Sequence, residues 1–269
     1  MPRGHLVIIG GGTIPNEVRS RALQLSGGAR SHVLIIPAAS ASPENASREV
    51  AEKLRALGAA DCEVNDLSRV DDAVSAVLRA DLIWFTGGDQ SRIIRAMAGP
   101  GSPIAEAIRR RYLEGATIAG SSAGAAVMSG LMMTGGSDLD TIRNGTTQLS
   151  DGLGLWNDVI IDQHFLKRGR FNRLAGAVLD HPDLLGIGID EATAVVVSGR
   201  EFEVTGQSNV IVVDGRPCKK SRSAQGPPPH AGDPASGVNM SLHILKAGMK
   251  YHLDKGVVGT GDAAQGGGQ

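Results

Sequence analysis

Short apolar runs alternate with segments of helical periodicity through the first half of the chain. Continuous apolar runs are typical of strands that are buried on both faces of a sheet. Such strands are predicted at Leu6–Ile9, Val33–Pro37, Cys62–Leu67 and Asp81–Phe85, and a further one begins at Ala116. Helices are predicted between them, over Pro15–Leu25, Pro43–Leu57, Asp71–Arg79, Gln90–Met97 and Pro103–Leu113. Because strand and helix alternate, we expect a parallel sheet with helices on both faces.

The pattern changes in the second half of the chain. Met133–Leu155 is rich in Gly, Ser and Thr, shows little periodicity, and is interpreted as a loop or flap. A strand at Val159–Asp162, a helix over Gly169–Leu179 and a strand at Leu185–Ile189 follow. Turns containing glycine then separate the short strands Ala194–Ser198, Glu201–Thr205 and Val210–Val213, and Met240–Leu245 is expected to be the last strand. These short strands predict an antiparallel extension of the sheet.

The expected fold class is therefore α/β, with a mostly parallel open sheet, helices on both faces and an antiparallel C-terminal extension. The 269 residues contain no recognisable repeat or linker, so we expect one domain over residues 1–258. The Gly-rich residues 259–269 are expected to form a disordered tail. Residues 218–237 are polar and rich in proline, and are interpreted as a mobile loop or a hairpin excursion.

Composition narrows the classes of function. Basic and acidic residues nearly balance, 27 against 28, and only 3% of residues are aromatic, so we expect neither nucleic acid nor a membrane as partner. Two cysteines are too few for a disulfide framework or a Cys-rich metal site. The N-terminal apolar stretch is too short for a signal peptide, and no segment is long enough to cross a bilayer. The simplest expectation is a cytoplasmic protein.

We expect neither a bound cofactor nor a metal. Gly10-Gly11-Gly12-Thr13 follows the first strand and invites comparison with a dinucleotide-binding turn. Pro15 stands where that fingerprint has its third glycine, and no acidic residue ends the second strand, so nucleotide binding is not favoured. No cluster of His, Cys and carboxylate residues has the spacing of a metal site.

Gly120-Ser121-Ser122-Ala123-Gly124 matches the pattern G-x-S-x-G between a predicted strand and a predicted helix. A serine in such a turn is lifted above the sheet, and the flanking glycines leave room for a substrate. The free amides at the start of the following helix favour negative charge beside the Ser122 hydroxyl. Small residues also let a helix pack closely on a sheet, so the motif alone leaves a catalytic and a structural interpretation open.

A nucleophilic serine needs a base and a group that orients the base. His164 alone among the histidines lies just past the carboxyl end of a predicted sheet strand, on the same edge as Ser122. Asp190 and Glu191 end another strand on that edge, and either carboxylate can orient the imidazole. Serine, histidine and acid together favour a hydrolase site over a structural turn.

Further residues at this edge are candidates for binding. Thr86-Gly87-Gly88-Asp89-Gln90 closes another strand, and the amides of Gly88 and Ala123 are predicted to form an oxyanion hole. Gln90 is a candidate substrate-binding residue.

Arginines are the natural clamp for a substrate carboxylate, and three follow His164: Arg168, Arg170 and Arg173. At least one of the three is expected to lie on an exposed helix face instead. Asp162 and Gln163 are candidates to hold this clamp or to bind a substrate amine.

The chain order is serine, histidine, acid, which differs from the serine, aspartate, histidine order of α/β-hydrolases. This order resembles the class I glutamine amidotransferase architecture. More specifically, four motifs resemble those of cyanophycinases: Thr86–Gln90, Gly120–Ala125, Asp162–Phe165 and Gly186–Glu191. The resemblance covers most of the chain and fades after about Val213. It implies Ser122 as nucleophile, His164 as general base and Glu191, rather than Asp190, as the orienting acid.

Cyanophycinases share a serine-peptidase family with the aspartyl dipeptidases (peptidase E). The resemblance implies an exopeptidase (omega-peptidase) that cuts cyanophycin, a polyaspartate with arginine on each β-carboxyl group, into β-Asp-Arg dipeptides through an acyl-enzyme. It also implies a homodimer. One alternative is an aspartyl dipeptidase acting on small Asp-containing peptides. Another is a non-catalytic ligand-binding protein that uses Gly10–Thr13.

Overall fold

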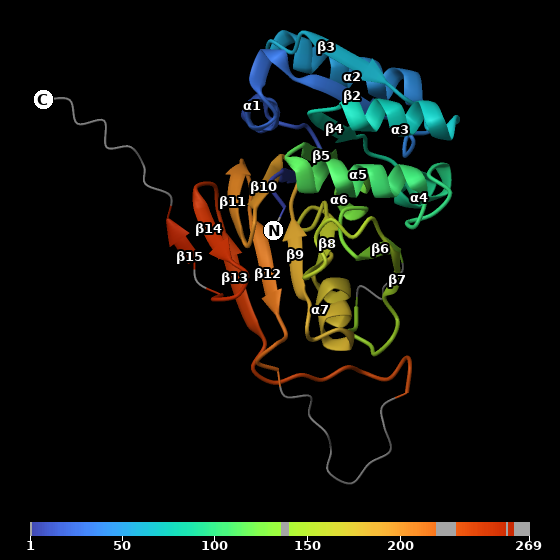
Figure 1. Ribbon diagram of the computed structural model, residues 1–269. Helices are drawn as coiled ribbons and strands as arrows, with labels where there is room; N and C mark the ends of the chain where they lie inside the picture. The colour runs from blue at the N-terminus through green and yellow to red at the C-terminus, as the bar shows by residue number, and fades with distance from the viewer. Residues whose placement is uncertain (1, 136–139, 219–229, 257, 261–269) are drawn as a thin grey trace, which may run out of the picture.

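The apolar runs of the first half form the parallel half of a nine-stranded sheet (Figure 1). The computed structural model describes residues 2–135, 140–218, 230–256 and 258–260. In the parallel half the strand order is β1-β5-β4-β2-β3. The bounds are His5–Ile9 for β1, His32–Ile36 for β2, Asp61–Val64 for β3, Leu82–Phe85 for β4 and Thr117–Ser121 for β5. This half is the predicted parallel sheet, and the α/β class is confirmed.

Helices cover both faces of this half because its strands are apolar on both sides. Val7 and Ile9 pack toward the helices α1 and α2, whereas Leu6 and Ile8 belong to the core under α3 and α5. A proline opens α2 and another opens α5, a position where the missing N–H costs no hydrogen bond. The helical bounds are Asn16–Leu25 for α1, Pro43–Ala56 for α2, Val70–Arg79 for α3, Gln90–Ala96 for α4 and Pro103–Glu114 for α5, with a short 3-10 turn at Gly28–Arg30.

The other half of the large sheet is antiparallel and continues from β1 through β10, β11, β14 and β15. Their bounds are Thr193–Ser198, Glu201–Gly206, Met249–His252 and Val258–Thr260. The predicted antiparallel extension is confirmed. The expectation that Met240–Leu245 is the last strand is wrong, since β14 and β15 follow it. Both strands are short and have no apolar run that would predict a strand. They are strands because β14 pairs with β11 and with β15.

A second, four-stranded sheet of order β13-β12-β9-β8 packs between the large sheet and the helix α7 (Figure 1). Its strands are β8 at Val159–Gln163, β9 at Leu185–Ile189, β12 at Val210–Asp214 and β13 at Ser241–Leu245, and α7 is Phe171–Asp180. The strands β8 and β9 were predicted as strands and are parallel neighbours, but they do not join the sheet that carries Ser122. A fully apolar run reads the same in either sheet, so the sequence pattern does not separate them.

The composition of Met133–Leu155 predicts a loop or flap. The structure shows that this segment is not simply a loop. Two strands, β6 at Leu131–Gly135 and β7 at Gln148–Asp151, pair as an antiparallel ribbon in this region. Strand propensity depends strongly on the neighbours that a segment packs against, which explains why a Gly- and Ser-rich stretch gave little signal.

Two predicted segments lie partly outside the described residues. Of residues 218–237, the part 219–229 is not described, and the part that follows pairs with the chain near Asn144, whose amide donates to the Asp233 carbonyl at 2.9 Å. The predicted start of the tail at Gly259 falls inside β15, and residues 261–269 are not described. Within the part of the chain that the structure describes, no helix has both the length and the apolar character needed to cross a membrane.

Candidate active site

Ser122 occupies a strained turn between β5 and the short helix α6, Ala123–Ala126. Its φ of 55° and ψ of −108° are costly for a residue with a side chain. The glycines of the motif are needed for close packing. A Cβ on Gly120 would lie 2.3 Å from the Gly124 carbonyl oxygen, and one on Gly124 would lie 2.5 Å from the Phe85 carbonyl oxygen. The structural interpretation of these glycines is therefore correct, and it holds together with the catalytic interpretation, because Ser122 itself is only half-buried.

Ser122, His164 and Glu191 are joined by hydrogen bonds. The Ser122 Oγ lies 2.9 Å from His164 Nε2, and His164 Nδ1 lies 2.6 Å from Glu191 Oε1. A carboxylate can only accept, so the proton resides on Nδ1 and Nε2 is left to accept from the serine hydroxyl. Asp190 points elsewhere, because its carboxylate accepts from the Lys167 amide at 2.9 Å and from the Ser208 hydroxyl at 2.7 Å.

The carboxyl end of β1 holds the three segments together. Three consecutive carbonyl groups there each accept one amide. The Ile9 carbonyl accepts from Ser122 at 3.0 Å, the Gly10 carbonyl accepts from His164 at 2.8 Å, and the Gly11 carbonyl accepts from Ala192, next to Glu191, at 2.9 Å. This is how a histidine delivered by the second sheet reaches a serine delivered by the first.

The glycines after β1 are functional residues that the sequence interpretation missed. A Cβ on Gly11, whose φ is +113°, would lie 2.3 Å from His164 Cε1. A Cβ on Gly12, whose φ is +68°, would lie 2.9 Å from both the Cβ and Oε2 of Glu191. The run Gly10–Gly12 is visible in the sequence at a strand end, where the pattern by itself suggests only a nucleotide-binding turn. Its observed role is to let imidazole and carboxylate approach the backbone.

Backbone strain is concentrated at this site. In the described part of the chain, six non-glycine residues have positive φ, and three of them are Ser122, His164 and Ala192, at 55°, 49° and 54°. Conformations of this kind cost about 1–3 kcal/mol each and persist only where the surroundings enforce them. Their clustering around one hydroxyl is an observation that points to function.

The electrostatics suit a neutral imidazole. Burial lowers the pKa of His164 below its usual value, the nearby positive charges of Arg168 and Arg170 lower it further, and the hydrogen bond to Glu191 opposes them. A lowered pKa favours the unprotonated imidazole, the form that can take a proton from Ser122.

Backbone amides are available beside the serine. Gly87 and Gly88 form a turn next to Ser122, and a Cβ on Gly87 would lie 3.6 Å from the Ser122 Cβ. Gly88 has a φ of +142°, and a Cβ there would lie 2.0 Å from the Ala39 carbonyl oxygen, so no larger residue fits. Within the described residues, neither the Gly88 amide nor the Ala123 amide donates to another backbone group. Both can donate to a substrate oxygen.

Four of the predicted substrate-binding residues are engaged with one another behind His164. Arg173 donates from Nε to Asp162 Oδ2 at 2.7 Å and from Nη2 to Asp162 Oδ1, and Asp162 is fully buried. Arg170 Nη1 donates to the carbonyl oxygen and to Oε1 of Gln163, both at 2.7 Å. In this network Arg173 is buried and Arg170 is half-buried, whereas Arg168 is exposed, as expected of at least one of the three, although it lies in the turn before α7 rather than on the helix.

A cavity of about 430 Å³ opens beside Ser122 and His164, and we call it the Ser122 cavity. Of the three arginines that follow β8, Arg168 is the one that lines it. Glu49, from α2, lies on another wall. Gln90 is not among the lining residues described, and its Nε2 donates to the Met133 carbonyl at 2.5 Å, which ties α4 to β6.

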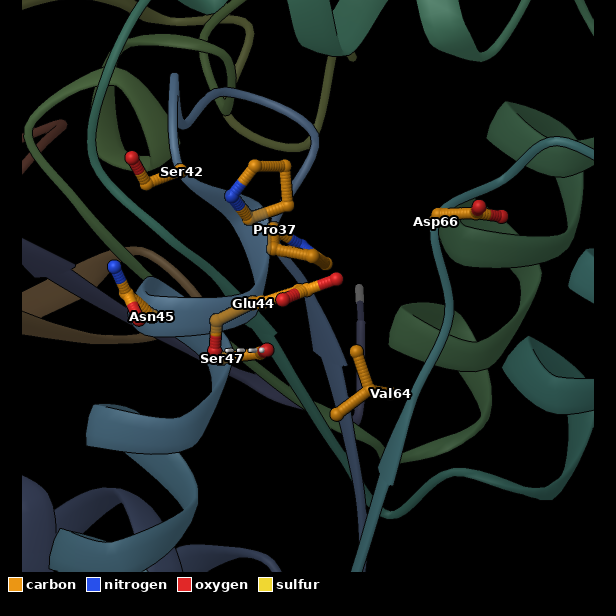
Figure 2. A pocket seen from close by; sticks show the side chains of 8 residues that line it. Pro37, Ser42, Glu44, Asn45, Ser47, Val64 and Asp66 are labelled. Atoms are coloured by element: carbon orange, nitrogen blue, oxygen red, sulfur yellow. Dashed lines mark hydrogen bonds between the residues drawn. The ribbon is translucent and has the colours of Figure 1, made fainter.

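A larger cavity of about 520 Å³ lies at the carboxyl ends of β2 and β3, beside the first turn of α2 (Figure 2). Its lining includes the carboxylates of Glu44 and Asp66. Figure 2 also shows the hydrogen bond that the Ser47 hydroxyl donates to the Glu44 carbonyl at 3.1 Å. Among the described residues that line this larger cavity, no nucleophilic side chain is hydrogen-bonded to a base. The smaller Ser122 cavity is therefore the candidate active site. Among the residues that the structure describes, no group of three or more His, Cys, Asp or Glu side chains is arranged to hold a metal ion.

Comparison with known proteins agrees with this geometry. The model of peptidase family S51 matches residues 6–205, which include Ser122, His164 and Glu191. The chain belongs to peptidase family S51. Membership of S51 makes it a serine-type peptidase, and the family match ends within β11, so the strands that follow lie beyond it.

Several relatives of this chain are named cyanophycinases. The cyanophycinase of Trichormus variabilis is 37% identical over 237 residues, which cover 85% of this chain and 77% of that protein. The cyanophycinase of Geminocystis herdmanii is 35% identical over 260 residues, covering 93% and 94% of the two chains. A solved peptidase from an acI-B1 Actinobacterium shares the fold with a TM-score of 0.65 at 22% identity, over 93% of this chain and 97% of that one.

Proposed function

We propose that this S51 peptidase hydrolyses cyanophycin to β-Asp-Arg dipeptides through an acyl-enzyme on Ser122. The observation that carries the proposal is the hydrogen-bonded series Ser122–His164–Glu191 at the wall of a cavity that Arg168 also lines. The relatives named cyanophycinase support the choice of polymer.

In the proposed reaction, His164 Nε2 takes the proton of Ser122 as Oγ attacks the carbonyl carbon of an aspartyl residue. Negative charge on the carbonyl oxygen is stabilised by the amides of Gly88 and Ala123. His164 then gives its proton to the leaving amine, and the C–N bond breaks. Water activated by His164 attacks the ester, and the acid product leaves while Ser122 regains its proton. Glu191 stabilises the imidazolium at each step.

For substrate binding we propose that Arg168 holds a carboxylate of the polymer at the mouth of the cavity, as a bidentate guanidinium can. Contact of Gln90, Asp162, Gln163, Arg170 or Arg173 with substrate would require their present hydrogen bonds to open. Opening the Asp162–Arg173 pair would leave a buried charge uncompensated, at a cost of about 3–5 kcal/mol. We therefore propose that the four residues of the network behind His164 position the His164 segment, whereas Gln90 ties α4 to β6.

The test is incubation with insoluble cyanophycin, followed by chromatography of the soluble dipeptide. The expected result is release of β-Asp-Arg by the wild type and no release by Ser122→Ala, whose melting temperature should match the wild type. A serine-directed phosphonate should label the wild type, and peptide mapping should assign the adduct to Ser122 rather than to Ser121. Turnover that persists in Ser122→Ala would exclude this nucleophile.

The same assay separates the alternatives. An aspartyl dipeptidase would cleave small Asp-containing peptides and leave the polymer intact. A non-catalytic binding protein would give neither product nor label. Two further features, the homodimer implied by the resemblance and the cytoplasmic location expected from the sequence, remain predictions. Sedimentation at micromolar concentration tests the first, and cell fractionation tests the second.

A further inference from the structure

Glu49 is the one acidic residue among the described residues that line the Ser122 cavity. It lies on α2 with Ala46 and Val50, and all three line the cavity. Their spacing of i, i+3 and i+4 places them on one face of the helix. This face of α2 therefore forms a wall of the cavity, and Glu49 gives that wall a negative charge.

The Glu49 carboxylate is accessible and unpaired. The residue is exposed, and within the described part of the chain its carboxylate takes part in no hydrogen bond and in no ion pair within 4.0 Å. Its charge acts on Arg19, which lines the cavity from α1, so the carboxylate lies on the side of α2 that borders the cavity. Arg19 itself donates to the Ile14 carbonyl oxygen and leaves the carboxylate oxygens open. Both oxygens can therefore accept hydrogen bonds from a ligand.

Arg168 gives the same cavity an accessible positive charge. It is exposed, as Glu49 is, and it lines the cavity from the turn that follows β8. Among the described residues, no ion pair joins Arg168 to Glu49, so neither charge satisfies the other. Complementary charges set the specificity of a binding site. The cavity thus fits a ligand that carries both a carboxylate and a cation.

The repeat of the proposed substrate carries both of these groups on one residue. Arginine that is joined through its amino group to an aspartyl β-carboxyl group keeps a free α-carboxylate and a guanidinium. Arg168 suits the carboxylate, and Glu49 suits the guanidinium, because two parallel N–H groups match two carboxylate oxygens. A side chain of the same shape without positive charge gains nothing from Glu49.

We propose that Glu49 is a specificity-determining residue that binds the cationic end of the side chain hanging from the aspartyl unit under attack. The identity of the ligand as such a repeat rests on the proposed function. A guanidinium can pair with both carboxylate oxygens, whereas a lysine ammonium acts as a point charge. Arginine pendants should therefore bind more tightly than lysine pendants, and uncharged pendants should bind least tightly.

The experiment compares soluble oligomers with arginine and with citrulline pendants in steady-state kinetics, because citrulline has the shape of arginine without its charge. Glu49→Gln should raise KM for the arginine oligomer by about 10-fold with kcat kept, the low end for a hydrogen bond to a charged group, since Glu49 is exposed. KM for the citrulline oligomer should not change. The control is Glu52→Gln, one turn further along α2, which is exposed, lies outside the cavity lining and should match the wild type.

Charge reversal and salt give readouts that a loss of packing would not move. Glu49→Lys should invert the preference, so that the citrulline oligomer has the lower KM, because the new ammonium repels a guanidinium. Added salt should weaken the preference of the wild type and leave Glu49→Gln unaffected, because salt screens exposed charges. A preference in Glu49→Lys equal to that of the wild type would refute the role of Glu49.

A binding measurement separates this inference from the proposed activity. Calorimetric titration of Ser122→Ala with both oligomers needs no turnover, and adding Glu49→Gln should remove the preference for arginine pendants. If the wild type does not cleave the polymer while this preference depends on Glu49, the role of Glu49 stands and the proposed function fails. If the polymer is cleaved but Glu49→Gln leaves KM and the preference unchanged, the role is refuted and the function stands. Equal affinity of Ser122→Ala for the two oligomers, or no binding of either, also refutes it.

Discussion

Gly11→Ala tests how closely the proposed base must approach the chain. The added Cβ would lie 2.3 Å from His164 Cε1 and 2.5 Å from His164 Nε2. Carbon atoms in ordinary contact are about 3.5 Å apart, so the ring must retreat by roughly 1 Å. A shift of that size, if it follows the line to Ser122, lengthens the present 2.9 Å bond beyond hydrogen-bonding range. Misplacing a catalytic group by about 1 Å costs on the order of 100-fold in rate, so kcat should fall by about that factor.

Gly27→Ala is the matched control, because Gly27 has the same φ of +113°. Its added Cβ would meet only Ser31 Oγ, at an ordinary 3.6 Å. Both variants bear the backbone cost of a side chain at this φ, about 1–3 kcal/mol, which urea unfolding measures. Only Gly11→Ala should lose activity in the dipeptide-release assay. The reasoning is wrong if Gly11→Ala retains wild-type kcat, or if Gly27→Ala loses as much activity as Gly11→Ala does.

Three further predictions follow from the same contacts. Glu191→Gln should lower kcat by about 10³-fold, because the imidazolium loses the carboxylate that stabilises it. Asp190→Asn should keep kcat, since the Asp190 carboxylate accepts hydrogen bonds from Lys167 and Ser208 and not from the imidazole. Steady-state kinetics compares the two variants. The acid limb of the pH profile of kcat/KM should follow the pKa of His164, which burial lowers below its ordinary value of 6.5. Arg168→Gln should move that limb to higher pH, because it removes a positive charge that lowers this pKa. A limb that does not move in this variant would contradict the prediction. Asp162→Ala should lower the free energy of unfolding by about 3–5 kcal/mol because it strands a buried arginine, and denaturant titration measures the loss.

The helices and strands of the first half were predictable because their signals are local. Apolar runs, prolines at helix starts and glycines at strand ends act within a few residues of one another. The ribbon of β6 and β7 gave no such signal, because its strands are held by partners rather than by their own composition. The second sheet was missed for the opposite reason: the apolar runs of β8 and β9 satisfy either sheet equally well.

The candidate site divides in the same way. That Ser122, His164 and an acid lie at strand ends follows from the sequence pattern, but the rule that parallel strands present their carboxyl ends to one edge holds within one sheet, and Ser122 lies in a different sheet from β8 and β9. The hydrogen bond from Arg173 to Asp162 could not be predicted from the local sequence, since an arginine on a helix is normally expected to be exposed. The burial of Arg19 on α1 has no local signal either, because burial of a charged residue depends on what the fold packs around it.

By itself, the sequence determined the order and kind of most elements, the α/β class and the strand ends that carry reactive groups. Only the tertiary structure decided that three carbonyls at the end of β1 gather Ser122, His164 and the Glu191 segment, and that Glu191 rather than Asp190 meets the imidazole. The physical reason is range. Periodicity and turn chemistry are properties of neighbouring residues, whereas hydrogen bonds between segments and the burial of charge depend on how distant parts of the chain pack together.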